Sequence, residues 1–448
     1  MRKQERRAWI CLALALVLFA GTCLFSYRFV KNGSRWAGFY GNTQIFTEGR
    51  INRGTVLDRH DEVLLQCTPD GLYYSDDWTT RVSTVHAVGD GNGNISYGAI
   101  NLFAGQLIGY DLLNGTYDTS ANGKTIQLTI DASANRAAYD ALNGRTGTVG
   151  VYNWKTGEIV CMVSTPAFDP ADEVPDDDGA YYFNNFLSGT MTPGSTFKTV
   201  TAAAVIDTLP DRDSFEFDCD GVNHYGDSGD TEFRDIYAHG EVDFREAMAV
   251  SCNGAFGELT REVGGKTMAE YAKKAGLTKS IEFDGIETAE GSFKFPTDDD
   301  VRLSWAGIGQ AQDLVNPCNM MVYMGSIANG GEAVQPTLIK STSFIDEIRG
   351  TKALGRYLDE STADELKSMM KNNVVENYGE ENFPGIDIYA KSGTAETGGD
   401  DSDAWFVGFT DDEETPYAFV VWIKEGGGGA SDAAPVANRV LQTLMANY

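Results

Sequence analysis

The sequence predicts an α/β domain carried on one membrane-spanning helix, and three patterns support this. An uncharged apolar run occupies residues 8–27. Strand-like stretches stand at both ends of the segment 145–448, and helix-like stretches lie between them. This order predicts one sheet in which the first hairpin joins the last strands, with helices packed against it.

The apolar run has the length that a helix needs to cross the hydrocarbon core of a bilayer. Basic residues flank it on both sides, and a large acidic body follows only on its C-terminal side. We therefore expect a cytoplasmic tail at 1–7, a signal anchor at 8–27 in the plasma membrane, and an extracellular body. A cleaved signal peptide is the alternative, but no clear Ala-x-Ala site follows the run.

The body is expected to contain two units. Residues 28–144 are rich in Gly, Asp, Asn and Thr and carry short strand patterns at 54–57, 62–65 and 125–130, which indicates a small strand-rich unit. A second unit occupies 145–448. Its strands are expected at 148–154, 158–164, 387–390, 404–410 and 417–424. Its helices are expected at 195–207, 244–263, 266–274, 316–329, 362–375 and 433–444.

Charge and composition exclude several kinds of partner and cofactor. The formal net charge is −30, which argues against nucleic acid and anionic lipid as ligands and favours a solubilising surface. The seven cysteines and four histidines are scattered, with no His-Glu-x-x-His motif, so we expect neither a disulfide framework nor a metal site. No cofactor is expected.

The segment 193–198, Pro-Gly-Ser-Thr-Phe-Lys, carries a candidate nucleophile. Ser195 falls at the start of an apolar helix, and Lys198 lies about one turn further on the same face. A neutral lysine there can accept the hydroxyl proton, and burial and the helix amino terminus both lower its pKa. A capping serine beside a surface lysine is the alternative, and Ser368 with Lys371 has the same spacing.

The order of three motifs favours Ser195. Serine enzymes of this kind need a later Ser-x-Asn and then a Lys-[Ser/Thr]-Gly on a strand. Ser251 and Asn253 supply the first, and the run Lys391, Ser392, Gly393 and Thr394 supplies the second. The competing matches at 133–135 and 155–157 both precede the nucleophile, and no Ser-x-Asn follows Ser368.

With these motifs the chain resembles the class B, monofunctional penicillin-binding proteins, of the short penicillin-binding protein A type. Further segments similar to that family are 53–59, 86–89, 109–111, 192–198 and 404–409. The resemblance implies an α/β (α+β) serine-transpeptidase or β-lactamase-like domain, in which helices flank a central antiparallel sheet. It also implies that residues 28–144 form a strand-rich pedestal. The sequence departs from the family pattern at Cys219, which has no second cysteine in the following loop.

The resemblance also implies a reaction. A peptidoglycan stem peptide ending in D-Ala-D-Ala would acylate Ser195, with Lys198 as the base, and an amine would resolve the acyl-enzyme into a crosslink. Ser251 would relay a proton and Asn253 would position the substrate amide. The terminal carboxylate would be bound by the strand motif, formed by Lys391, Ser392, Gly393 and Thr394. β-Lactams would inhibit by acylating Ser195.

Partners and alternatives follow from the same resemblance. The pedestal segment begins almost directly after the anchor, which leaves no room between them for a glycosyltransferase module, so a multi-spanning polymerase is expected as a partner. A D,D-carboxypeptidase or β-lactamase using water shares the Ser–Lys chemistry. A non-catalytic β-lactam sensor or cell-wall scaffold is the remaining alternative, which the complete motif set disfavours.

Overall fold

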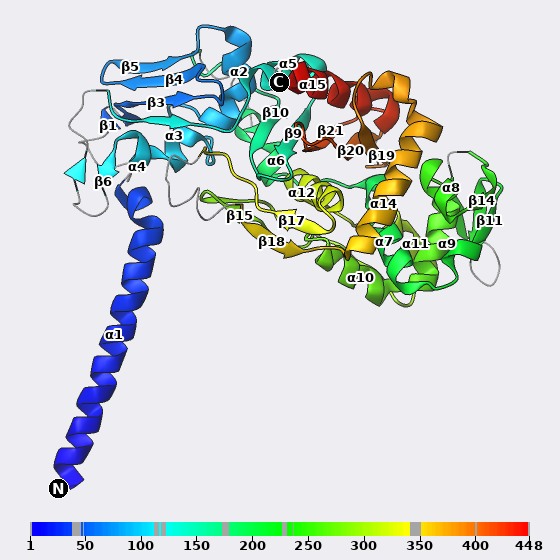
Figure 1. The fold of residues 1–448 in the computed structure, drawn as a ribbon, viewed down its shortest axis with the longest axis horizontal. Helices are drawn as coiled ribbons and strands as arrows, with labels where there is room; N and C mark the ends of the chain where they lie inside the picture. Colours follow the sequence, from blue (N-terminus) through cyan, green and yellow to red (C-terminus); the bar gives the residue numbers. More distant parts are fainter. Residues whose placement is uncertain are drawn as a thin grey trace.

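The computed structural model shows a long N-terminal helix projecting from a body made of a small strand-rich part and a larger mixed part (Figure 1). The structure describes residues 2–37, 46–47, 49–111, 116–117, 122–172, 179–225, 231–235, 237–340, 351–398 and 401–446. All statements below concern these residues.

Helix α1 (Arg2–Ala37) points away from the body, with the amino terminus at its far end (Figure 1). Within it, Lys3–Val30 is long and apolar enough to cross a membrane, and its most apolar 18-residue window has a mean hydropathy of 2.4. None of its most apolar window is buried against the body, so these side chains need an apolar environment of another kind. The predicted anchor at 8–27 lies inside this longer helix.

The strand-rich part contains a four-stranded sheet in the order β5-β4-β3-β8. Its strands are β3 (Gly54–Leu57), β4 (Val63–Thr68), β5 (Gly71–Tyr74) and β8 (Thr125–Gln127), and β8 runs parallel to β3. Smaller elements of this part are β1 (Phe46–Thr47), β2 (Arg50–Ile51), α2 (Trp78–Val88), α3 (Ala99–Leu102), α4 (Ala104–Leu107), β6 (Tyr110–Asp111) and β7 (Thr116–Tyr117).

The larger part is built on a five-stranded antiparallel sheet in the order β10-β9-β21-β20-β19. Its strands are β9 (Gly147–Asn153), β10 (Ile159–Thr165), β19 (Ile388–Ala395), β20 (Asp403–Thr410) and β21 (Tyr417–Ile423). The first hairpin therefore joins the last strands, as predicted. Both faces of the inner strands are buried, which explains their continuous apolar runs.

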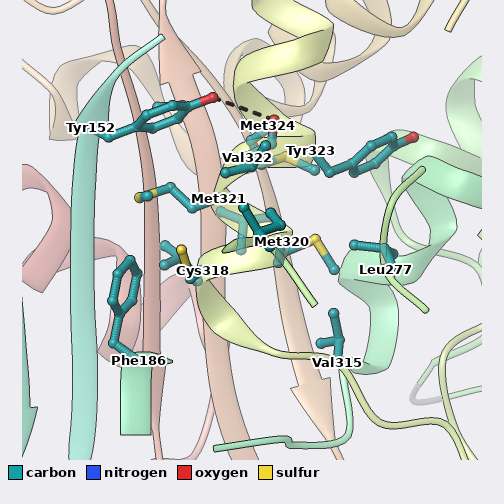
Figure 2. Close-up of a cluster of buried hydrophobic side chains, with 14 of the residues drawn as sticks. Tyr152, Phe186, Leu277, Val315, Cys318, Met320, Met321, Val322, Tyr323 and Met324 are labelled. Atoms are coloured by element: carbon teal, nitrogen blue, oxygen red, sulfur yellow. Dashed lines mark hydrogen bonds between the residues drawn. The ribbon is translucent and has the colours of Figure 1, made fainter. Parts of the chain in front are cut away.

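Helices cover both faces of this sheet. On one face α5 (Ala132–Leu142) and α15 (Ala434–Ala446) pack with Val149, Val151 and Phe419 in one apolar cluster. On the other face lies α12 (Pro317–Ala328), which is buried along its whole length. Figure 2 shows its side chains between Tyr152 of β9 and Leu277, and the Tyr152 hydroxyl donates to the carbonyl of Val322 at 3.4 Å.

A group of helices and short hairpins stands beside the β19 edge (Figure 1). The helices are α7 (Lys198–Thr208), α8 (Phe244–Ala249), α9 (Asn253–Val263), α10 (Gly265–Lys274), α11 (Asp300–Gly307) and α14 (Glu360–Asn373). The hairpin strands are β11 (Glu216–Cys219), β12 (Val222–Tyr225), β13 (Thr231–Arg234) and β14 (Gly240–Asp243). The other elements are α6 (Asn185–Ser188), β15 (Glu282–Phe283), β16 (Ile286–Glu287), β17 (Glu332–Val334) and β18 (Ala353–Arg356).

One sequence prediction is wrong in this region. A single helix was expected over 244–263, but α8 ends at Ala249 and α9 starts at Asn253. Ser251 between them has a φ of +59°, which no α-helix accommodates. The apolar pattern continues through the break, so only the structure reveals that the Ser-x-Asn motif sits on a turn.

Candidate active site

Ser195 lies in a short 3-10 helix, η2 (Gly194–Phe197), that runs directly into α7. Two hydrogen bonds hold the chain before it. The indole Nε1 of Trp405 on β20 donates to the carbonyl of Thr192 at 2.9 Å, and Gly194 N donates to the carbonyl of Gly309 at 2.9 Å. The predicted nucleophile is therefore positioned by the central sheet and by the segment after α11.

Gly194 permits a close approach between this turn and β19. Its φ is +53°, and a Cβ added there would lie 2.9 Å from the carbonyl oxygen of Thr394. Only glycine meets both requirements without strain. The start of η2 thus packs against the strand that carries the third motif.

Lys198 is fully buried one helical turn after Ser195. Its Nζ donates to Asn253 Oδ1 at 2.8 Å, to the carbonyl of Ser251 at 2.5 Å, and lies 3.2 Å from Ser251 Oγ. Burial lowers the pKa of Lys198 to about 8, and the charge of Asp235 opposes this shift. About a tenth of Lys198 is therefore neutral at pH 7, and this base-competent fraction grows as the pH rises.

Lys391 approaches the same serine from β19. Its Nζ donates to Ser251 Oγ at 2.9 Å and to the carbonyl of Ser392 at 2.9 Å. Burial, together with the nearby charge of Lys198, places the pKa of Lys391 well below its usual value. Ser251 Oγ thus lies between two lysines, which suits a hydroxyl that passes a proton.

Ser392, Gly393 and Thr394 continue β19 beside η2. A Cβ on Gly393 would lie 2.9 Å from the side chain of Thr196, which shows how closely the two elements pack. Thr394 Oγ1 accepts a hydrogen bond from Gly429 N at 3.5 Å. The structure therefore brings the three predicted motifs together at one edge of the sheet.

Sequence reasoning missed Tyr378. This residue ends a π-helical turn, η4 (Val374–Tyr378), that follows α14. Its hydroxyl accepts a hydrogen bond from Ser392 N at 2.8 Å and bonds Ser392 Oγ at 3.0 Å. Burial raises the pKa of Tyr378, so the hydroxyl stays protonated. No sequence motif indicates Tyr378, because its contact with Ser392 joins two segments that come together only in the folded chain.

The competing matches lie elsewhere. Ser368 and Lys371 are on α14, where Lys371 pairs with Glu380 at 2.8 Å and with Asp387 at 2.9 Å. Residues 155–157 form the turn between β9 and β10, as predicted. Neither match lies beside the other two motifs, as Ser195 does.

A cluster of possible metal ligands was also missed. Cys219, Asp235, His239 and Cys252 offer ligand atoms that all lie within 4.8 Å of one another. All four lie between residues 219 and 252, so the expectation that the cysteines and histidines are scattered is wrong for these residues. Cys252 stands between Ser251 and Asn253, so the cluster adjoins the active site.

Comparison with known proteins identifies relatives of the chain. A family model described as the penicillin binding protein transpeptidase domain matches residues 147–442. The peptidoglycan D,D-transpeptidase PbpA of Mycobacterium tuberculosis is 26% identical over 377 residues, which cover 76% of this chain and 76% of that protein.

Solved structures share the fold. Penicillin-binding protein A of M. tuberculosis, in its penicillin G acyl-enzyme complex, has a TM-score of 0.71 at 22% identity and covers 88% of this chain and 99% of its own. The D,D-transpeptidase domain of an Eggerthella lenta peptidoglycan glycosyltransferase has a TM-score of 0.72 at 24% identity, covering 89% and 99%. The predicted fold class and family resemblance are confirmed.

Proposed function

Because the chain belongs to the penicillin-binding protein transpeptidase family, we propose that it is a serine-type peptidoglycan D,D-transpeptidase. The observation that carries the proposal is the convergence of Lys198, Ser251 and Lys391 beside the turn that holds Ser195. D,D-transpeptidation is also the activity in the name of the mycobacterial relatives. Acyl transfer needs a nucleophile, a base and an oxyanion site, and each has candidate groups here.

In this mechanism Ser195 Oγ attacks the carbonyl between the two terminal D-Ala residues of a stem peptide, and Lys198 Nζ accepts the hydroxyl proton. The backbone N–H groups of Ser195 and Thr394 stabilise the oxyanion. The close packing of Gly194 against Thr394 supports the assignment of these two N–H groups to the oxyanion site.

The other motif residues act on the leaving group and the substrate. Ser251, held between Lys198 and Lys391, passes the proton to the leaving D-Ala nitrogen as the scissile C–N bond breaks. Asn253 Oδ1 holds Lys198 Nζ, and Asn253 positions the substrate amide. Lys391, Ser392 and Thr394 bind the terminal carboxylate, while Gly393 allows β19 to lie close to η2.

An acceptor amine from a second peptide then attacks the acyl-enzyme, forming the crosslink and freeing Ser195. A β-lactam acylates the same oxygen as its ring opens, and penicillin-binding protein A of M. tuberculosis forms such an acyl-enzyme complex with penicillin G. Water in place of the amine would give the D,D-carboxypeptidase or β-lactamase reaction.

The arrangement relative to the membrane is also a proposal. Residues 8–27, inside the apolar segment Lys3–Val30, anchor the chain, residues 28–144 act as a pedestal, and 145–448 carry the chemistry outside the cell, where peptidoglycan lies. A multi-spanning glycosyltransferase supplies the glycan strands that the site crosslinks. Protease applied to intact cells should remove the body; full protection would contradict the external placement.

Fluorescent penicillin tests the nucleophile. The detergent-solubilised full chain should be labelled, Ser195→Ala should not, and Ser368→Ala, in the competing motif, should be labelled like the parent chain. Equal labelling of the Ser195 variant would refute the assignment. Supplying a stem pentapeptide and an acceptor amine then distinguishes a crosslinked product from simple release of D-Ala.

A further inference from the structure

We propose that Gln310 ends the stretch of β19 with which a donor peptide can pair, so that the peptide binds the backbone of Thr394 and then leaves the strand. Gln310 is thereby a specificity-determining residue, which limits how much of the donor the enzyme recognises by backbone pairing. The substrate in this inference rests on the proposed function, whereas the contact of Gln310 with the end of β19 does not.

β19 is the last strand in the order of the five-stranded sheet and pairs with β20 along one edge. We call the edge away from β20 the outer edge. In an antiparallel strand the N–H and C=O groups of alternate residues point to the same edge. The N–H of Ser392 donates to the Tyr378 hydroxyl at 2.8 Å, so Ser392 faces the outer edge. The backbone groups of Thr394 and Glu396 therefore face the outer edge as well.

Side chains from α14 and η4 occupy the outer edge before Thr394. Asn373 Nδ2 donates to the carbonyl of Ala390 at 3.0 Å, and the Tyr378 hydroxyl holds Ser392 N. Asn373 is fully buried, and Tyr378 is 6% exposed. An edge strand presents its N–H and C=O groups to any extended peptide, and side chains that bond these groups remove them as pairing sites.

Gln310 occupies the outer edge after Thr394. Its amide faces the backbone of Glu396, which directly follows β19. The orientation that satisfies both residues has the amide nitrogen donating to the Glu396 carbonyl at 3.2 Å and the amide oxygen accepting from Glu396 N at 3.0 Å. Gln310 thus bonds both backbone groups of Glu396, as a paired strand would, and it is 7% exposed.

The loop that carries Gln310 is bent so that it holds this side chain in place. Gly309 and Ala311, on either side, have φ values of +75° and +68°. A positive φ at alanine is a strained conformation that surrounding contacts have to maintain. Gln310 N donates to the carbonyl of Trp305 at 2.9 Å, and the Gly309 carbonyl accepts from Gly194 N at 2.9 Å. The loop is therefore tied both to α11 and to the nucleophile turn.

These contacts limit the donor peptide. Its terminal carboxylate is proposed to lie at Lys391 and Ser392, so the rest of the donor runs antiparallel to β19 toward Glu396. The D-Ala that carries the scissile carbonyl then pairs with Thr394. The residue two positions earlier in the donor would pair with Glu396, where Gln310 already bonds the backbone. The donor must therefore leave β19 before its fourth residue from the carboxyl end.

Hydrogen exchange tests the contact without any reaction. In the full chain in detergent, the Glu396 amide should exchange slowly, and in Gln310→Ala at least about tenfold faster, because its acceptor is removed. Gln312→Ala is the matched control: this neighbouring amide accepts from Lys294 Nζ at 2.8 Å on the exposed surface, and its loss should leave Glu396 protected. Mass spectrometry with electron-transfer fragmentation of peptides spanning 390–398 measures the rate.

Two depsipeptide donors test the limit on the peptide. Propionyl-D-Ala-D-lactate ends before the residue that would reach Glu396, and acetyl-L-Ala-L-Ala-D-Ala-D-lactate contains it. Release of lactate with a fixed acceptor amine gives kcat/KM. In the parent chain and in Gln312→Ala the two donors should differ by less than about twofold. In Gln310→Ala the longer donor should gain at least about fivefold over the shorter one, because the Glu396 N–H and C=O become available to it.

The outcomes separate this inference from the proposed function. Fast exchange at Glu396 in the parent chain would overturn the contact. A parent chain that gains about fivefold from the longer donor, or a folded Gln310→Ala that gains nothing, would overturn the limit on donor length. If Gln310→Ala does not fold, Gln310→Met, which keeps the side-chain volume, replaces it in the exchange measurement. Slow exchange at Glu396 in a chain that neither donor acylates would count against the proposed function and leave the Gln310 contact standing.

Discussion

Lys391 Nζ donates a hydrogen bond to Ser251 Oγ at 2.9 Å and thereby joins β19 to the turn before α9. Lys198 Nζ lies on the other side of the same hydroxyl, at 3.2 Å. Burial lowers the pKa values of both lysines, and the nearby charge of Lys198 lowers that of Lys391 further.

This arrangement predicts how acylation depends on pH. Lys198 must be neutral to accept the Ser195 proton, and its pKa is about 8. The acylation rate should therefore rise about tenfold per pH unit below that value and level off above it. Stopped-flow measurement with a chromogenic β-lactam between pH 6 and 9 checks this, with Lys371→Met as a control whose profile should not move.

Lys198→Arg extends the same prediction. A guanidinium does not lose its proton in this range, so the variant should lose the rise with pH and at least about a hundredfold in rate. A profile unchanged in Lys198→Arg would show that another group is the base.

Tyr378→Phe should weaken substrate binding more than it slows the chemical step. The change removes a hydroxyl that holds both the N–H and the Oγ of Ser392, and Ser392 is proposed to bind the terminal carboxylate. Loss of a net interaction of about 1–1.5 kcal/mol corresponds to roughly a tenfold higher KM with kcat little changed.

A second tyrosine, Tyr389 on β19, provides a control for the loss of a tyrosine hydroxyl. The Tyr389 hydroxyl contacts Asp387 on the exposed side, and Tyr389→Phe should leave both constants as they are. A fall in kcat alone in Tyr378→Phe would contradict the positioning role.

The central sheet and the three motifs were predictable because their signals are local. The strand runs in 147–165 and 403–423 are almost wholly apolar, which is how a strand buried on both faces appears. The order of Ser195, Ser251 and Lys391 singled out the three segments that the structure brings together at one sheet edge.

The missed features depend on tertiary contacts. Ser251 interrupts a continuous helical pattern because Asp235 caps a new helix from a distant segment. Tyr378 acts through a π-helical turn, and the Cys219–Cys252 cluster forms only when two hairpins fold over α9. No spacing rule along the chain reports these contacts.

The Arg81–Asp169 pair should stabilise the chain by joining the two parts of the body. Arg81 of α2 donates from Nε and Nη2 to Asp169, at 2.9 and 2.6 Å, and both side chains are largely buried. Arg81→Met should lower the free energy of unfolding by about 1 kcal/mol in urea at pH 7. Arg302→Met, in an exposed pair with Asp299, should have almost no effect.

The pKa of Asp169 determines how the stabilisation by the Arg81–Asp169 pair changes with pH. Its hydrogen bonds to Arg81 lower its pKa in the folded chain, so the stabilisation is fully present above the ordinary carboxyl pKa and is lost as the pH falls through the lowered value. A double-mutant cycle with Asp169→Asn should show coupling at pH 7 and less of it in acid. Coupling that grew on acidification would contradict this account.

Gly309→Ala should damage the site through the nucleophile turn. Gly309 has a φ of +75°, and an added Cβ would lie 2.3 Å from the carbonyl oxygen of Gly194, on the backbone that precedes Ser195. Gly144 has a nearly equal φ of +78°, but a Cβ there meets nothing within 4 Å. Both alanine variants therefore carry a positive-φ strain of about 1–2 kcal/mol, and only Gly309→Ala adds a backbone clash.

The pair isolates the effect of the close approach. Gly144→Ala should lose stability and keep its acylation rate with fluorescent penicillin, whereas Gly309→Ala should lose more stability and at least about tenfold in rate, because η2 must shift. Urea unfolding and labelling kinetics measure the two quantities on the same samples. Equal losses of stability and rate in both variants would mean that backbone strain, and not the contact between Gly309 and Gly194, limits the position of Ser195.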